Sequence, residues 1–598
     1  MINQKDNSQT SIIERVTDYE PPRNFRSWLI GRPLSTADAS HQTIGKIVGL
    51  AVFASDALSS TAYATQEILG VIAAAGTMAY GYLFPISLAI ITLLAIVTIS
   101  YEQTIHAYPG GGGAYIVARD NLGEMPAQTA GAALLTDYIL TVSVSISAGV
   151  AQIVSAYPAL FPYRVVIAVI AVFFIMLINL RGVKESGTAF AVPTYFFVVM
   201  MVGTVGFGVF RYFTGSLGMV IDPPHFEAKH VLSAITPFIL LHAFANGTTA
   251  LTGVEAISNG ITAFKEPRSK NAGITLIWMS LILGTLFLAL SFLTGKVQAV
   301  FSEEETVISQ LARTIYGGRG ALYLMLISGT TVILIMAANT AFADFPRLGA
   351  LHAGDGFLPR QLTYRGSRLV YSRGIVSLAV IASILIIIFQ ASVTRLIPLY
   401  AIGVFLSFTL SQAGMARRWW KIGHLAEGVE VIEPGSTLKY EKGWQYRMMI
   451  NGFGAVCTAV VMVVFAVTKF REGAWVVLIL TPLLVTIFFS IHHHYKRLAK
   501  KLSLDNFGVI PPHAIRHRVI MPVSGVHQGT LAALRYARML SDDITAVHVT
   551  IEPAEAEKVR QKWETWGEGV RMVMLDSPYR LFIEPILGYI ADVAKQRQ

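Results

Sequence analysis

The sequence predicts an all-α polytopic membrane protein with about twelve transmembrane helices, followed by a small cytosolic α/β domain. Three observations predict this fold. The 598 residues are 53% hydrophobic and only 14% charged, whereas a soluble domain carries about 25% charged residues. Apolar runs near the length that crosses a bilayer recur up to Tyr495. After Tyr495, strand-like and helix-like segments alternate. This composition excludes a large soluble enzyme and a disordered chain.

The apolar runs are expected to be helices. Only helices and closed barrels satisfy the backbone in lipid, and runs such as residues 90–97 lack the alternation of a barrel strand. The predicted spans are residues 45–74, 83–106, 126–156, 163–180, 190–212, 231–262, 272–295, 320–345, 374–391, 394–413, 448–468 and 474–494.

Basic residues predict the orientation of the spans. With the N-terminus inside, they are concentrated in five inside loops, and the outside loops hold far fewer. The loop before the eleventh span carries Arg417, Arg418, Lys421, Lys439, Lys442 and Arg447. By the positive-inside rule, both termini are expected in the cytoplasm. Topology thus explains the net charge of +10, and no nucleic-acid partner is expected.

The chain beyond the spans predicts a small parallel sheet. Strands are expected at 517–523, 543–549 and 570–575, and helices at 529–540, 553–566 and 583–595. So short a domain has an incomplete sheet, which dimerisation or strand exchange would complete. The predicted organisation is a cytosolic N-terminal segment (1–44), a transmembrane domain (45–495), a linker (496–514) and the α/β domain (515–598).

Two of the spans are interrupted by polar and small residues. The interruptions lie in residues 49–63 and 244–255, five helices apart and at corresponding places in two five-helix halves. Such a pair is typical of inverted-repeat transporters, whose substrate site lies where the first and sixth helices unwind. The alternative is that small polar residues only allow close helix packing.

Carboxylates within the apolar runs are the candidate functional groups. A carboxylate at the bilayer centre costs at least about 2.5 kcal/mol, so Asp56, Asp137 and Glu255 indicate function. Asp137, Thr141 and Ser145 are spaced four residues apart and share one helix face. Oxygen ligands of this kind suit a hard alkali cation.

Further oxygen ligands lie near the interruptions. Tyr63 follows Asp56 by seven residues, and Thr252 precedes Glu255 by three. Tyr400, on the tenth helix, is another candidate, although a lone tyrosine is as often a packed side chain with a satisfied hydroxyl.

From about residue 40 to 500, the chain resembles the amino acid–polyamine–organocation superfamily, which has the leucine-transporter fold with a 5+5 inverted repeat. Phe244–Gly260 resembles its sixth helix, and Ala338–Arg360 resembles its eighth helix and the following cytoplasmic loop. Amino-acid permeases of this superfamily have a glycine-rich break in the first helix that holds a substrate carboxylate. This sequence has Asp56 there, which would repel a carboxylate and attract a cation.

Within the superfamily, the chain resembles the KimA-type high-affinity potassium importers of the potassium-uptake (KUP) branch. The matching residues are Asp56, Tyr63, Asp137, Tyr138, Thr141, Ser145, Thr252, Glu255 and Tyr400. The segment 515–598 resembles the cytosolic domain of these importers, which is similar to a universal stress protein.

The resemblance implies inward potassium transport by proton-coupled symport across the bacterial plasma membrane, through alternating access. It also implies a homodimer joined through the cytosolic domains and inhibition by cyclic di-AMP. The substrates are then potassium and a proton, and no cofactor is expected.

The residues receive roles on this hypothesis. Potassium is held by Asp56, Tyr63, Asp137, Thr141 and Thr252, and its path is lined by Tyr138, Ser145 and Tyr400. Some superfamily members use a fifth-helix lysine for proton coupling, but the predicted fifth helix contains none between residues 190 and 210. Glu255 is therefore the first choice for the group that exchanges the proton.

Two alternatives remain open. A proton-coupled amino-acid permease fits the eighth-helix pattern but not the aspartate in the first break. A membrane receptor or transceptor would use the cytosolic domain to signal. An enzyme is not expected, because the sequence has no evident nucleophile–base pair or catalytic metal cluster.

Overall fold

The computed structural model divides the chain into two compact units. The first, here called the transport unit, comprises residues 42–364 and 371–489, and the second, the C-terminal unit, comprises 1–41, 365–370 and 490–598. The structure describes residues 12–16, 31, 33, 43–72, 77–111, 113–224, 235–302, 304–433, 435–503 and 518–595. The predicted linker beyond residue 503, the start of the predicted α/β domain at 515–517 and most of segment 1–44 lie outside these residues.

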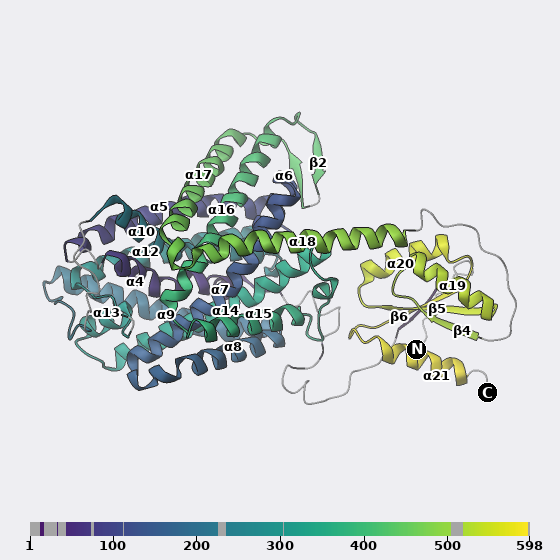
Figure 1. The fold of residues 1–598 in the computed structure, drawn as a ribbon, viewed down its shortest axis with the longest axis horizontal. Helices are drawn as coiled ribbons and strands as arrows, with labels where there is room; N and C mark the ends of the chain where they lie inside the picture. Colours follow the sequence, from purple (N-terminus) through teal and green to yellow (C-terminus); the bar gives the residue numbers. More distant parts are fainter. Residues whose placement is uncertain are drawn as a thin grey trace. The chain divides into compact units, whose positions relative to one another are not determined.

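The first unit is helical (Figure 1). Its helices up to the middle of the chain are α2 (Lys46–Phe53), α3 (Ser55–Ser59), α4 (Thr61–Ile72), α5 (Leu83–Ala107), α6 (Gly113–Leu122), α7 (Glu124–Ala156), α8 (Arg164–Arg181), α9 (Val183–Phe213), α10 (Pro237–Gly247), α11 (Ala256–Asn259) and α12 (Arg268–Val297). They are followed by α13 (Val307–Tyr316), α14 (Ala321–Gly354), α15 (Ser372–Ile388), α16 (Val393–Gly423), α17 (Trp444–Thr468) and α18 (Ala474–Leu502).

Within the described residues, nine helices are long and apolar enough to cross a membrane, and α15 is a shorter apolar helix. The two interrupted spans are each assembled from short helices instead. The predicted number of twelve spans stays a prediction.

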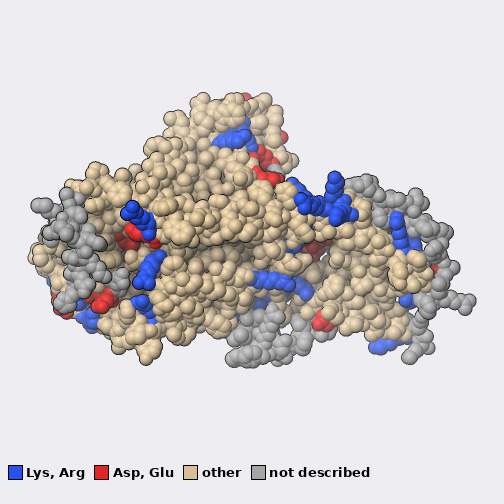
Figure 2. All heavy atoms as spheres, viewed as in Figure 1, with Lys and Arg blue, Asp and Glu red and all other residues tan. Residues whose placement is uncertain are grey.

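Helix α7 forms the centre of the transport unit. It packs against α6, α8, α14, α15 and α16. In its most apolar stretch 78% of the residues are buried, against 17% in the segment Pro158–Arg181 that contains α8. α8 instead turns Ile170, Phe173 and Phe174 outward, as expected of a helix that faces lipid. Figure 2 shows few charged side chains over the helical bundle, and basic ones gathered at the C-terminal end of α18.

Several helices extend past their predicted ends. α14 continues to Gly354, α16 to Gly423 and α18 to Leu502, where the apolar runs end at 345, 413 and 494. A charged residue ends an apolar run but not a helix, because arginine and lysine are good helix formers. The short helices α6 and α13 and the hairpin of β2 (Glu430–Glu433) and β3 (Ser436–Lys439) were also not predicted.

Both predicted interruptions are real breaks. The first falls between α2, α3 and α4, around Ala54 and Ser60. In the second, α10 tightens into the 3-10 helix η5 (Thr248–Leu251) before the chain opens. Thr252 is extended there and Gly253 has a φ of +83°, a left-handed conformation that favours glycine.

The C-terminal unit contains a four-stranded parallel sheet. Its elements from the C-terminal part of the chain are β4 (Arg518–Pro522), α19 (Gln528–Leu540), β5 (Asp543–Thr550), α20 (Pro553–Trp566), β6 (Arg571–Asp576) and α21 (Ile583–Lys595). These agree closely with the predicted alternation. Side chains alternate across β5, where Ala546 joins the core that contains α19 and α20, and Val547 joins the core that contains α21. The helices therefore cover both faces of the sheet.

The fourth strand comes from the other end of the chain. β1 (Ile12–Val16) pairs in parallel with β6, which makes the strand order β1-β6-β5-β4. The sequence predicts that dimerisation or strand exchange completes the sheet, but in this chain a strand of the N-terminal segment does so. Residues 365–370 also belong to this unit, and the Arg580 guanidinium donates a hydrogen bond to the Ser367 carbonyl at 2.7 Å.

The pairing of β1 with β6 leads to a first prediction. Replacing two adjacent residues of β1 by proline (Ile13→Pro with Glu14→Pro) removes whichever of the two N–H groups points to β6. Each lost backbone hydrogen bond contributes about 1 kcal/mol, so amide protection on the β1 side of β6 should fall by on the order of tenfold. Hydrogen exchange of residues 571–576 measures this.

The matched control is the double alanine variant, Ile13→Ala with Glu14→Ala, which keeps both N–H groups. Unchanged exchange in the proline variant would mean that β1 does not pair with β6 in solution.

Candidate functional site

The two helix breaks meet at the centre of the transport unit. A side chain added at Gly253 would lie 2.6 Å from Asp56 Oδ2 and 3.0 Å from the Ala57 nitrogen. The Ser60 hydroxyl donates a hydrogen bond to the Ala250 carbonyl at 3.1 Å. The Asp56 carboxylate is thus packed directly against the opened backbone of the second break.

The nine residues selected from the sequence are all buried. Their exposed fractions do not exceed 4%, and they are Asp56, Tyr63, Asp137, Tyr138, Thr141, Ser145, Thr252, Glu255 and Tyr400. They come from both breaks and from α7 and α16. The Thr141 hydroxyl donates to the Tyr400 hydroxyl at 3.1 Å, which joins α7 to α16 beside the breaks. At Gly403, α16 approaches α7 so closely that an added Cβ would lie 2.9 Å from the Ala133 carbonyl.

The three carboxylates form one electrostatic group. Asp137 interacts with both Glu255 and Asp56, and Asp56 interacts with Glu255. Like charges so placed repel one another in a medium of low dielectric constant. A cation among them would offset this repulsion.

Several of these side chains have an oxygen with no hydrogen-bond partner. Within the part of the chain that the structure describes, these buried atoms are Asp56 Oδ1, Tyr63 Oη, Asp137 Oδ1, Ser145 Oγ and Glu255 Oε2. A buried polar atom without a partner costs free energy, so such a group calls for an explanation. Hard oxygens around a break in two helices are what a desolvated alkali cation requires.

Tyr138 lies apart from the Thr141 and Tyr400 pair. Its hydroxyl accepts a hydrogen bond from the Asn259 side-chain amide at the end of α11. Asn259 Oδ1 in turn lies against Gly113 at the start of α6, where an added Cβ would collide with it. The Tyr138 side chain therefore faces the end of the bundle that carries α6, opposite to the end that carries α13 (Figure 1).

Asp344 was not selected as a site residue. It lies on α14 with both carboxylate oxygens buried, its Oδ1 is 3.8 Å from Arg347 Nη1, and it interacts electrostatically with Glu255 and Tyr138. The criterion that selected the other carboxylates also applies to it, because it falls within the apolar run 320–345. In the sequence, Asp344 lies within the segment Ala338–Arg360 that resembles the eighth helix.

At the α6 end, polar contacts tie α6 to the end of α14. Tyr115 Oη donates to Asp355 Oδ2 at 2.7 Å, and Arg119 Nη1 donates to the same oxygen at 2.9 Å. The ring of Tyr115 stacks on His352 with 3.9 Å between ring centroids. These contacts hold α6 against the C-terminal end of α14.

Known proteins are similar to this chain over most of its length. The family described as "Amino acid permease" matches residues 34–489, and the "KimA potassium transporter C-terminal domain" matches residues 515–598. The chain is 42% identical to the potassium transporter KimA of Bacillus subtilis over 581 residues, which cover 96% of this chain and 91% of that protein. The chain belongs to the KimA family. It is also 23% identical to the low-affinity putrescine importer PlaP of Escherichia coli K12 over 278 residues, 45% of this chain and 59% of PlaP.

Membership of this family confirms the fold class and the expectation that the chain is not an enzyme. The chain is a multi-pass membrane protein of the permease type with a C-terminal domain that contains a small sheet. The KimA family consists of transporters, which move a substrate and do not convert it.

The contact between the breaks leads to a second prediction. Gly253→Ala places a Cβ 2.6 Å from Asp56 Oδ2 at a residue with positive φ. The backbone strain alone costs about 1–3 kcal/mol, so the melting temperature of the purified protein should fall.

Gly206→Ala on α9 is the control, because an added Cβ there meets no atom within 4 Å. If both variants melted at the parent temperature, the close approach of the two breaks would be contradicted.

Proposed function

We propose that this protein imports potassium through the site at the two helix breaks. The observation that carries the proposal is the group of buried, unpartnered oxygens around Asp56, Asp137 and Glu255. The 42% identity to the potassium transporter KimA over nearly the whole chain also supports the proposal.

The chemistry of the site favours a small monovalent cation. The carboxylates supply negative charge, and hydroxyl oxygens from Tyr63, Thr141 and Thr252 complete a shell of hard donors. Potassium is held among Asp56, Tyr63, Asp137, Thr141 and Thr252. Tyr138, Ser145 and Tyr400 line the path.

Uptake is coupled to a proton that Glu255 exchanges. Glu255 follows the opened backbone at Thr252 and Gly253, so any rearrangement of that break changes its surroundings. The protein alternates between the two faces of a bacterial plasma membrane, with both termini in the cytoplasm. In that orientation the α6 end faces the cytoplasm, and the α13 end faces outward.

The C-terminal unit joins two copies of the chain, and cyclic di-AMP inhibits the protein. The match of residues 515–598 to the KimA C-terminal domain supports a shared role for this unit.

An amino-acid permease is the second candidate, because the family that matches residues 34–489 is described by that activity. The Asp56 carboxylate argues against it, since it lies in the first helix break, where such permeases hold a substrate carboxylate. Labelled potassium uptake with an excess of unlabelled amino acids separates the two functions. Competition by amino acids favours the permease.

Asp56→Asn should abolish potassium uptake into proteoliposomes. One carboxylate–cation contact near 4 Å contributes about 4 kcal/mol at an effective dielectric constant of about 20, so uptake at low potassium should fall by on the order of 100-fold or more. Asp222→Asn is the control, because this carboxylate is 91% exposed. Parent-like uptake by Asp56→Asn would reject the site.

Glu255→Gln should separate potassium uptake from the proton gradient. An amide cannot exchange a proton, so the variant should show the same residual uptake with and without a pH gradient, while the parent responds to the gradient. Proteoliposomes with set internal and external pH measure this. A variant that still responds like the parent would assign the proton to another group.

A further inference from the structure

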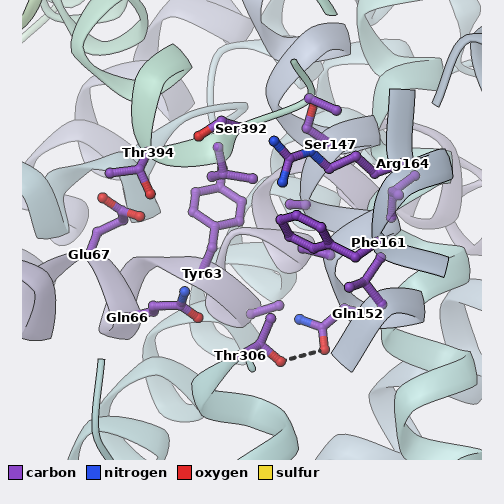
Figure 3. A pocket seen from close by; sticks show the side chains of 17 residues that line it. Tyr63, Gln66, Glu67, Ser147, Gln152, Phe161, Arg164, Thr306, Ser392 and Thr394 are labelled. Carbon is purple, nitrogen blue, oxygen red and sulfur yellow. Dashed lines mark hydrogen bonds between the residues drawn. The ribbon is translucent and has the colours of Figure 1, made fainter. Parts of the chain in front are cut away.

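A pocket lies beside Tyr63 on the α13 side of the site. Its volume of about 70 Å³ has room for several water molecules or a partly hydrated ion. Oxygen-bearing side chains of α4, α7 and α16 line it, including Tyr63, Gln66, Glu67, Ser147, Gln152 and Thr394 (Figure 3). Tyr63 borders both this pocket and the site at the helix breaks.

Glu67 is the carboxylate of this pocket. It lies one helical turn beyond Tyr63 on the same face of α4 and is only 5% exposed. Its carboxylate makes no hydrogen bond or ion pair with any residue that the structure describes. Lys469 interacts with it electrostatically but is itself paired with Glu472 at 2.5 Å. A buried carboxylate without a partner raises the free energy of the protein unless a cation binds beside it.

The other polar groups of the pocket are largely engaged. The Gln66 side-chain oxygen accepts the Val307 N–H at 3.1 Å, and that of Gln152 accepts the Thr306 hydroxyl at 2.8 Å. Arg164, at the pocket wall, donates to the Gln390 carbonyl at 2.8 Å. Among the buried side chains of the pocket, the oxygens left for a ligand are those of Glu67, Ser147 and Tyr63, and those of Ser147 and Tyr63 have no hydrogen-bond partner among the described residues.

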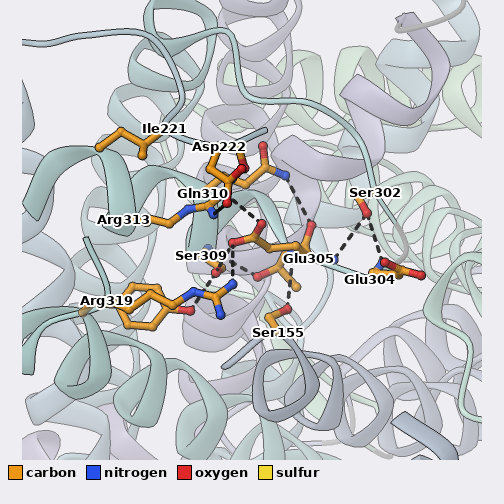
Figure 4. A network of polar contacts seen from close by, with 12 residues as sticks. Ser155, Ile221, Asp222, Ser302, Glu304, Glu305, Ser309, Gln310, Arg313 and Arg319 are labelled. Carbon is orange, nitrogen blue, oxygen red and sulfur yellow. Dashed lines mark hydrogen bonds and ion pairs between the residues drawn. The ribbon is translucent and has the colours of Figure 1, made fainter. Parts of the chain in front are cut away.

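A network of charges fixes the segment that holds these glutamines. Glu305 is buried and forms ion pairs with Arg313 at 3.0 Å and with Arg319 at 3.8 Å (Figure 4). Its neighbour Thr306 is the N-cap of α13, and the Thr306 N–H donates to the Ser155 hydroxyl at 3.1 Å. These contacts hold in place the segment around Glu305 and Thr306, which bounds the pocket.

We propose that this pocket is a second cation site, in which Glu67, Ser147 and Tyr63 hold a partly hydrated potassium ion before it passes to Asp56. The inference rests on the proposed function, since the second site binds the imported ion on the outer side of the central site. Tyr63 then contacts the ion in both positions. The site raises the local concentration of potassium at the entrance to the central site.

Transport kinetics test the role of Glu67. Glu67→Gln should raise the external potassium concentration for half-maximal uptake by on the order of tenfold, because one charge contact to the ion is lost, and should leave the maximal rate close to the parent value. Glu304→Gln removes an exposed carboxylate from the same end of the bundle and should change neither quantity. An unchanged half-maximal concentration in Glu67→Gln overturns the inference. So does a lost maximal rate with an unchanged half-maximal concentration.

Chemical labelling tests occupancy without transport. Cys457→Ser removes the single cysteine, and Ser392→Cys then places a thiol at the pocket. External potassium, compared with choline, should slow the reaction of this thiol with a membrane-impermeant methanethiosulfonate. Adding Glu67→Gln should abolish the protection. Equal protection with and without Glu67 overturns the inference.

The two proposals fail in different ways. If the parent protein takes up no potassium, the proposed function fails. If the parent takes up potassium but Glu67→Gln behaves like Glu304→Gln, only the second site fails.

Discussion

The structure depends on the cost of placing charge and open backbone inside a bundle of apolar helices. Lipid offers no hydrogen bonds, so each interrupted helix must find partners within the protein. Here the two breaks provide them for each other. Ser60 donates to Ala250, and Gly253 makes room for the Asp56 carboxylate. The two interrupted helices therefore stabilise each other at one point, and the candidate site lies there.

The remaining helices serve this junction. α7 is the most enclosed of the long apolar helices in the described part of the chain, and its residues Asp137 and Thr141 lie beside the breaks. Helix α8 exposes an apolar surface instead. A central helix that buries polar residues and an outer helix that exposes apolar ones reverse the usual pattern of a soluble protein, because the solvent is lipid.

Polar residues lead away from the junction in both directions. Towards the α6 end lie Tyr138, Asn259 and Asp344. Towards the α13 end, Tyr63 opens on the pocket of Glu67. A transporter needs polar residues on both sides of its site, and here each side contains a carboxylate, Asp344 on one and Glu67 on the other. Towards the α13 end, the polar residues reach the segment around Glu305, which ion pairs hold in place. Towards the α6 end, they reach the contacts of Asp355 with α6.

Composition and spacing alone determined the membrane class, the two breaks, the buried carboxylates at 56, 137 and 255 and the order of strands and helices after residue 515. These features are local, because a span needs about 20 apolar residues and a carboxylate within such a run stands out. The same criterion also selects Asp344, which lies within an apolar run. Glu67 was less evident, because the first span is polar near its break.

Only the tertiary structure decided which distant segments meet. No local pattern indicates that residues 12–16 pair with β6 across more than 500 residues of sequence, that residues 365–370 pack with the C-terminal unit, or that Tyr63 lies between two polar sites. Such contacts depend on shape and packing between segments far apart in the chain, and periodicity within one segment carries no information about its partner.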